Sequence, residues 1–244
     1  MSGAETRKPL GRIAGAGACR GSTRERTGAA RVLGSWRLYR TTVSIPRPTR
    51  RRNMRLFIAL NLPQAERERI HEAAAPLREA GYPVRWLDPD RFHLTLKFLG
   101  EVRSERVPTV ERVVERVAAS TGSFEMEVAG FGAFPTIRRP RVLWVGVTPD
   151  PALRCLKQDL EWALANHGFE RETRAFHPHI TLGRVDVPNG AGAFRGLDEE
   201  AAGLDYRSRV PVRTVELMRS HLSRKGARYS VVRECELKVA ASKS

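Results

Sequence analysis

The hydrophobic and polar positions of this chain show two periodicities, one typical of β-strands and one typical of α-helices. Short apolar runs bounded by Gly, Pro or Asp predict strands at 55–61, 84–87, 92–99, 124–134, 142–147, 210–222 and 227–238. Apolar residues spaced by three or four, or helix-forming runs closed by a glycine, predict helices at 64–80, 107–119 and 151–166. Residues 186–205 are expected to be mostly loop, and Arg224-Lys225-Gly226 a hairpin turn.

Two segments carry the same four-residue pattern, His93-Leu94-Thr95-Leu96 and His179-Ile180-Thr181-Leu182. Successive side chains of a strand point to opposite faces. Each histidine therefore shares a face with its threonine, while the aliphatic residues point toward a core. One such tetrad alone is more often a buried strand with a hydrogen-bonded histidine. Two copies favour a functional unit that is repeated in the chain.

The order of the elements around the tetrads repeats as well. Each half of the chain passes from a strand to a helix and then to strands that end in H-x-T-L, and the two histidines are 86 residues apart. This repetition predicts the duplication of a small α+β unit. We expect a bilobal α+β fold, in which two pseudo-symmetric lobes of antiparallel sheet and helix face each other across a central cleft.

Composition and charge narrow the class of protein. The chain has 244 residues, 41% hydrophobic and 29% charged, which is ordinary for one globular domain. No apolar run approaches the roughly 20 residues that span a bilayer, so no membrane association is expected. The formal net charge is +16, but residues 1–53 hold 13 of the 43 basic residues and two of the 27 acidic ones. The remaining net charge of +5 is compatible with a polyanionic ligand and equally with none.

The division at residue 53 also marks a change in pattern. Residues 1–53 are rich in Gly, Ala, Arg, Ser and Thr without a sustained apolar period, which predicts a disordered basic extension. Three interpretations stay open: a nucleic-acid-binding arm, an organelle transit peptide, or a translated upstream stretch whose natural start is Met54. We favour the third, because a clean strand follows Met54 at once. Residues 54–244 are expected to form the two-lobed domain.

The spacing of the cysteines and of the possible metal ligands argues against a disulfide framework and against a metal site. Cys19, Cys155 and Cys235 show no C-x-x-C spacing, so reduced, incidental thiols in the cytoplasm are the expectation. The one candidate metal pair is His177 with His179, and no nearby cysteine or acid completes a ligand set. We therefore expect neither a metal nor another cofactor.

The paired tetrads suit acid and base chemistry at phosphorus. If the lobes face each other, His93 and His179 line one cleft, where one imidazole can take a proton from a nucleophile and the other can protonate the leaving oxygen. Thr95 and Thr181 can donate hydrogen bonds to the non-bridging oxygens. Arg184, five residues after His179, can add a fixed positive charge where the transition state is most negative.

At this point the residues amount to a family resemblance. The segments FHLTLKFLGEV (92–102), FGAFP (131–135), PRVLWVGV (140–147) and FHPHITLGR (176–184) together resemble the two-histidine phosphoesterase superfamily. Within it they are similar to the RNA 2′,3′-cyclic phosphodiesterases, also called 2′-5′ RNA ligases. The resemblance covers residues 54 to about 240 and has no counterpart for the extension before Met54.

The resemblance implies a fold, an activity and a site. It implies a bilobal α+β fold in which the terminal segments form one lobe and the middle of the chain the other. It implies metal-independent opening of a terminal 2′,3′-cyclic phosphate on RNA, or on a small cyclic nucleotide, to a 2′-phosphate, with reversible 2′-5′ ligation as a possible side reaction. The catalytic residues carried over are His93 and His179. The phosphate-binding residues are Thr95, Thr181 and Arg184.

The sequence leaves open which histidine is the acid and whether the protein catalyses a reaction or only binds RNA. To leave a 2′-phosphate the departing oxygen is O3′, and we assign its proton donor to His93 and the base for water to His179, although a pseudo-symmetric site could run either way. A non-catalytic binder of RNA ends and a general basic RNA-binding domain are the competing functions. We expect a monomer, and we expect core packing for most of four aromatic residues that could instead stack a base: Phe57, Trp86, Phe98 and Trp144.

Overall fold

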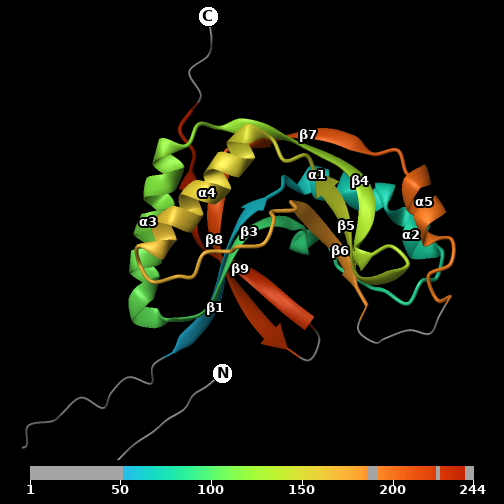
Figure 1. Cartoon of the computed structure of the whole chain (residues 1–244), viewed down its shortest axis with the longest axis horizontal. Helices are drawn as coiled ribbons and strands as arrows, with labels where there is room; N and C mark the ends of the chain where they lie inside the picture. The colour runs from blue at the N-terminus through green and yellow to red at the C-terminus, as the bar shows by residue number, and fades with distance from the viewer. Residues whose placement is uncertain (1–51, 186–191, 224–225, 240–244) are drawn as a thin grey trace, which may run out of the picture. The chain divides into compact units, whose positions relative to one another are not determined.

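The computed structural model describes residues 52–185, 192–223 and 226–239 and contains one mixed α+β unit (Figure 1). The predicted extension 1–53 lies outside these ranges except for its last two residues. The strands are β1 (Asn53–Asn61), β2 (Arg85–Trp86), β3 (His93–Arg103), β4 (Phe124–Thr136), β5 (Arg139–Val147), β6 (His179–Arg184), β7 (Arg207–Val212), β8 (Thr214–Ser223) and β9 (Gly226–Glu236). The α-helices are α1 (Gln64–Ala73), α2 (Ala75–Glu79), α3 (Val107–Ser120), α4 (Pro151–Ala165) and α5 (Leu197–Gly203).

The strands form two antiparallel lobes that meet at one point. In order of hydrogen-bonded neighbours they run β7-β4-β5-β6-β3-β1-β8-β9, with β2 attached to β6. β3 and β6 pair through Leu94 and Ile180 alone, so the sheet divides there into one lobe of β1, β3, β8 and β9 and another of β4 to β7. This arrangement confirms the predicted bilobal α+β fold. It also matches the expectation that the two ends of the chain share a lobe.

The helices cover the lobes in a way that the linear repeat does not suggest. α3 and α4 pack together against β3, β8 and β9, whereas α2 and α5 pack against the lobe of β4 and β5 (Figure 1). The predicted apolar faces are real, since each helix buries its periodic residues. In α4 these are Leu153, Leu156, Leu160 and Leu164, all fully buried.

Both tetrads end in the same irregularity of the ladder. Opposite β1, Ala59 pairs with Thr95 and Ile58 with Lys97, so Leu96 is the extra residue of a β-bulge. Opposite β5, Trp144 pairs with Thr181 and Leu143 with Gly183, so Leu182 is the extra residue there. The duplication therefore includes the bulge as well as the H-x-T-L sequence. A bulge re-aims the side chains that follow it.

Three sequence predictions about element bounds were wrong. The predicted helix 64–80 is two helices, because Pro76 lacks the N–H that would continue α1. The predicted strand 210–222 is two strands, since β7 pairs with β4 and β8 pairs with β1 in the other lobe, with Arg213 between them. β3 does not end at Gly100 but passes through it at φ 69°, a conformation that glycine adopts without strain.

The predicted loop 186–205 contains the short helix α5, and its residues 186–191 lie outside the described ranges, as do Arg224 and Lys225 of the predicted hairpin turn. Cys155 is an exposed free thiol and Cys235 a buried one. Within the described part of the chain, no helix is long and apolar enough to cross a membrane.

Candidate active site

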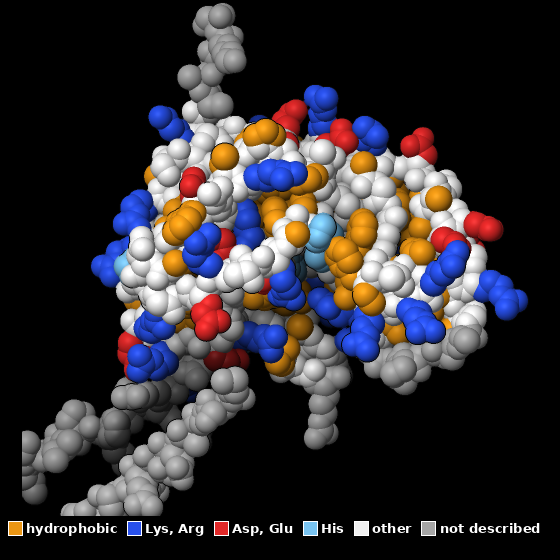
Figure 2. All heavy atoms as spheres, viewed as in Figure 1, with side chains coloured by type: hydrophobic (Ala, Val, Ile, Leu, Met, Phe, Trp, Pro, Cys, Tyr) orange, Lys and Arg blue, Asp and Glu red, His pale blue; other side chains and the backbone are white. Residues whose placement is uncertain are grey.

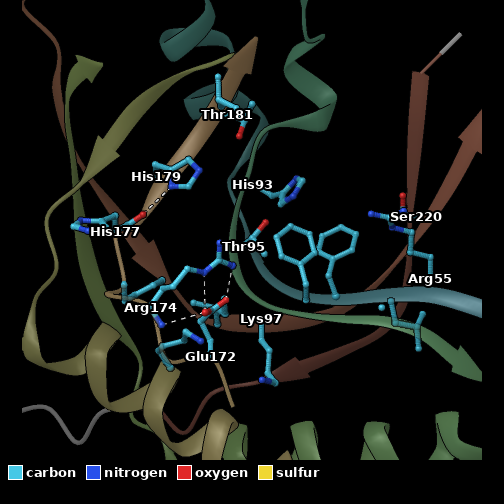
Figure 3. Close-up of a pocket in the computed structure, with 18 of the residues that line it drawn as sticks. Arg55, His93, Thr95, Lys97, Glu172, Arg174, His177, His179, Thr181 and Ser220 are labelled. Atoms are coloured by element: carbon cyan, nitrogen blue, oxygen red, sulfur yellow. Dashed lines mark hydrogen bonds and ion pairs between the residues drawn. The ribbon is translucent and has the colours of Figure 1, made fainter. Parts of the chain in front are cut away.

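A cleft of about 1230 Å³ lies between the two lobes, and both tetrads line it. Figure 2 shows histidine surface at the bottom of a hollow that hydrophobic and basic side chains border. Figure 3 shows the side chains of His93 and Thr95 entering from β3, and those of His179 and Thr181 from the neighbouring β6. The sequence predicted that these four residues and Arg184 would share one site. The structure brings all five to this cleft.

The strand pattern explains why the histidines and threonines point into the cleft. Leu94, Leu96, Ile180 and Leu182 are at most 3% exposed and belong to the main core, as the alternation predicted. Because the strands run antiparallel with Leu94 opposite Ile180, each histidine lies near the threonine of the other tetrad along the ladder. Each lobe therefore contributes one imidazole and one hydroxyl to a common site.

Each catalytic-looking imidazole is held by a backbone carbonyl two residues earlier. His93 Nδ1 lies 2.8 Å from the carbonyl oxygen of Arg91, and His179 Nδ1 lies 2.7 Å from that of His177. A carbonyl oxygen can only accept, so Nδ1 must carry the proton in both rings. In the neutral form this leaves Nε2 of each ring as the nitrogen that can exchange a proton with a ligand.

Aromatic rings pack against both imidazoles and set their titration. Phe57 and Tyr229 lie with ring centroids 5.1 and 5.0 Å from that of His93. Burial lowers the pKa of His93 to about 4; the Arg91 carbonyl opposes this shift, and positive charge from Arg67, Arg184 and His179 adds to it. Above that pH His93 is neutral as long as no anion binds beside it.

The second histidine has a matching aromatic wall. Phe134 packs edge-on against His179, with their ring centroids 4.9 Å apart, and the Trp144 ring centroid lies 6.3 Å from that of His179. Gly132 of the FGAFP segment makes room for this wall, because a Cβ there would lie 2.4 Å from the Trp144 ring. Burial again lowers the pKa of His179, opposed by the His177 carbonyl and reinforced by Arg184.

The cleft is positively charged. Its lining contains seven basic side chains and three acidic ones, a formal excess of four positive charges before the histidines are counted. Arg184 is exposed at the end of β6, and its charge depresses the pKa of both histidines. Arginines beside neutral imidazoles favour an anionic ligand, and a phosphate group fits that requirement.

A buried ion-pair cluster forms the floor of the cleft. Lys97 of β3 and Lys157 of α4 both donate to the Glu161 carboxylate, and Lys97 also donates to the Glu170 carbonyl oxygen at 2.7 Å. The backbone N–H of Glu172 donates to the same carboxylate at 3.2 Å. The cluster ties β3 and α4 to the segment that leads into β6. Sequence reasoning missed it, because the bulge at Leu96 is what turns Lys97 toward α4.

Of the other histidines, His177 borders this site, with its ring centroid 6.4 Å from that of Phe134, and His221 and His167 lie outside the cleft lining. The His177 ring is exposed, and its carbonyl rather than its side chain holds His179. His221 is exposed and lies 2.9 Å from Ser230 Oγ, and His167 is exposed just beyond α4. Within the residues that the structure describes, no three His, Cys, Asp or Glu side chains gather as a metal site would require.

Comparison with known proteins places the chain among phosphoesterases. The family model for LigT-like phosphoesterases matches it twice, at residues 60–144 and 145–229. An Aeropyrum pernix protein named RNA 2′,3′-cyclic phosphodiesterase is 35% identical over 168 residues, which cover 68% of this chain and 92% of that protein. A Thermotoga maritima protein of the same name is 33% identical over 185 residues, covering 75% of this chain and 95% of that protein.

Solved structures agree with the sequence matches. A crystal structure of a Thermus thermophilus protein superposes with a TM-score of 0.64 at 28% identity, over 77% of this chain and 100% of that chain. Escherichia coli LigT, solved in complex with 3′-AMP, superposes with a TM-score of 0.59 at 28% identity, over 76% of this chain and 98% of that chain. The two matched halves each contain one H-x-T-L tetrad.

Proposed function

Because this chain belongs to the LigT-like phosphoesterase family, we propose that it opens terminal 2′,3′-cyclic phosphates on RNA and leaves a 2′-phosphate. The observation that carries this proposal is the pair of imidazoles, one from each lobe. Both have Nδ1 tied to a carbonyl and Nε2 available, in a cleft with excess positive charge. Opening a cyclic phosphate needs one proton removed from water and one delivered to O3′, and two such nitrogens supply both transfers.

In-line attack requires one histidine to act as a base and the other as an acid. Water approaches phosphorus opposite O3′, so the base and the acid must stand on opposite sides of the phosphate, as residues from facing lobes do. We assign His179 as the base for water and His93 as the donor to O3′. The pKa of His93 is lowered in the free protein, but a phosphate anion beside it favours the imidazolium, so substrate binding itself promotes the protonated form.

The other three residues act on the phosphate. The Thr95 and Thr181 hydroxyls donate to the non-bridging oxygens, and the Arg184 guanidinium offsets the charge that grows on them in the transition state. The hydroxyls are half-buried and fixed by β3 and β6, so they need little reorganisation when the reaction proceeds. The same groups serve ligation when a 5′-hydroxyl replaces water: its oxygen bonds to phosphorus, its proton goes to the base, and the bond to O3′ breaks, which leaves a 2′-5′ linkage.

The direct test is product analysis with the full chain. The protein is incubated, in the presence of a chelator, with an oligonucleotide that ends in a 2′,3′-cyclic phosphate, and the product end is identified. We expect a 2′-phosphate. A 3′-phosphate, no reaction, or loss of turnover on chelation would overturn the proposal.

The titration of the histidines predicts an acidic optimum. One ring must be protonated and the other neutral, so kcat/KM, which reports the free enzyme, peaks between their two pKa values. The pKa of His93 is about 4 and that of His179 is lowered from 6.5, so kcat/KM should be highest below pH 6.5 and fall as pH rises further. Bound phosphate raises both pKa values, and the kcat profile should therefore lie at higher pH. Coincident profiles, or a kcat/KM optimum well above 6.5, would contradict this.

We propose in addition that the enzyme acts as a monomer in the cytoplasm and that RNA ends, rather than free cyclic nucleotides, are its main substrates. The size and positive charge of the cleft support the RNA substrate, since a single cyclic nucleotide would leave much of 1230 Å³ empty. Comparing kcat/KM for an oligonucleotide and a mononucleotide separates the two.

A further inference from the structure

Arg67 of α1 does not line the catalytic cleft, but it is bonded to the turn that leads into the first tetrad. Its guanidinium donates two hydrogen bonds, from Nε to the Leu62 carbonyl oxygen at 2.8 Å and from Nη1 to the Asp90 carbonyl oxygen at 3.3 Å. Leu62 follows β1 and Asp90 precedes β3. One planar, rigid group therefore joins two backbone segments that are distant in the sequence.

The position of this contact matters because the pairing of β1 with β3 ends there. The last paired residues are Asn61 and His93. The chain that precedes β3 forms the short 3₁₀ helix η1 (Pro89–Arg91), against which α1 packs. The carbonyl of its last residue, Arg91, lies 2.8 Å from His93 Nδ1. The orientation of the imidazole therefore depends on η1 as well as on the strand, and Arg67 fixes η1 from the side of α1.

The second repeat contains a matching arginine without the second contact. Arg154 is the fourth residue of α4, as Arg67 is of α1. In both, Nε donates to a carbonyl oxygen five residues earlier, which for Arg154 is that of Pro149 at 2.9 Å. Within the described residues, this is the one hydrogen bond of the Arg154 side chain. The Nε bond thus belongs to the start of the helix in both repeats, whereas the bond to Asp90 reaches a catalytic turn.

The charge of Arg67 acts on the same histidine. Burial is the largest cause of the lowered pKa of His93, the Arg91 carbonyl opposes it, and the positive charge of Arg67 adds to it. A lower pKa makes the protonated ring a stronger proton donor. The neighbouring elements η1, β6, β8 and β9 contribute further charged or titratable groups: Arg91, His179, Arg184, Glu216 and Tyr229. Arg67 acts on His93 in two ways, through the turn and through its charge.

We propose that Arg67 is a positioning residue for His93, which holds η1 to the end of β1 and thereby sets the orientation in which Nε2 of the ring faces the phosphate. The effect on turnover rests on the proposed function, whereas the effect on the ring does not. A displacement of about 1 Å in a catalytic group can cost about a hundredfold in rate. Hydrogen bonds outside the cleft can therefore control the reaction within it.

The substitution Arg67→Met tests the positioning by kinetics, since it keeps an unbranched side chain and removes both hydrogen bonds. On an oligonucleotide with a 2′,3′-cyclic phosphate we expect kcat to fall about 10-fold to 100-fold, with KM little changed, because Arg67 does not line the cleft. In a His93→Ala background the same substitution should lower kcat no further, because the group that Arg67 positions is gone. Arg154→Met is the matched control and should retain wild-type kcat and KM.

A titration by NMR keeps the test independent of turnover, since isotopically labelled imidazole nitrogens report which one carries the proton and where each ring titrates. Wild-type His93 should be the Nδ1–H form above about pH 4. In Arg67→Met we expect a mixture of Nδ1–H and Nε2–H forms and a higher pKa of His93, with the His179 signals little changed. Arg67→Lys keeps the charge but not the planar fork, so it should show the mixture without the rise in pKa.

Three results would each overturn the inference: unchanged His93 signals in Arg67→Met, unchanged kcat in that variant, or an equal loss of kcat in the His93→Ala background. Absence of any hydrolysis by wild type, with the expected changes in the His93 signals, would instead overturn the proposed function.

Discussion

Replacing either His93 or His179 with alanine should lower kcat on a 2′,3′-cyclic phosphate by about a hundredfold to ten-thousandfold, while KM changes little. Each imidazole performs one proton transfer, and a transfer of this kind is worth that factor. Both rings are held at the cleft by one carbonyl and their aromatic neighbours, so alanine removes the proton carrier without removing a core residue. Steady-state kinetics measures the loss. Substrate binding retained without turnover distinguishes an enzyme from a pure binder of RNA ends.

A substrate with sulfur in place of O3′ separates the two roles. A thiolate leaves without being protonated, so it no longer needs the acid. We expect this substrate to restore turnover to His93→Ala but not to His179→Ala. The reverse pattern would exchange the roles of the two histidines, and rescue of neither would contradict acid catalysis at the leaving group. His167→Ala is the control, since this exposed histidine beyond α4 lies outside the cleft lining and should behave as wild type.

The sequence was sufficient to predict the central part of the site because it depends on local rules. Alternation in a strand determined which face His93 and Thr95 share, and the repeat at His179 and Thr181 indicated two equivalent elements. The helix α4 was predicted nearly to the residue, since its four leucines repeat with the period of a helix. These features require no knowledge of what lies across the fold.

Other features could not be predicted because they depend on non-local pairing. The bulges arise from the register of β3 against β1 and of β6 against β5, and they decide that Phe98 faces the cleft while Lys97 faces α4. The break between β7 and β8 exists because the chain changes lobe at Arg213, and the nearest turn-type residue, Pro211, still pairs within β7. Periodicity within one segment contains no information on these pairings.

The second large effect is expected at the ion-pair cluster on the floor of the cleft. The substitution Glu161→Gln should lower the free energy of unfolding by about 3–5 kcal/mol. Glu161 is 6% exposed and accepts hydrogen bonds from both Lys97 and Lys157, neither of which is more than 11% exposed at its side chain. Glutamine keeps the shape but removes the charge, which leaves two ammonium groups without a counterion in a poorly solvated place. Denaturant unfolding measures the change. Glu115→Gln, which breaks the exposed pair with Arg233, is the control and should unfold at nearly the same denaturant concentration as wild type.

The pH dependence of the stability loss in Glu161→Gln tests whether that loss is electrostatic. Burial alone would raise the pKa of Glu161, but the hydrogen bonds from Lys157, Lys97 and the Glu172 backbone outweigh it, and the net shift is downward from 4.5. A carboxyl whose pKa is lower in the folded state stabilises the protein above the unfolded value and loses that contribution as pH falls through the folded one. The gap between wild type and Glu161→Gln should therefore be full at neutral pH and shrink below about 4.5. A stability difference that stays constant with pH would mean that the glutamine disturbs packing rather than charge.

The double variant Lys97→Met with Glu161→Met should be more stable than Glu161→Gln, because it removes one of the two unpaired ammonium groups together with the carboxylate.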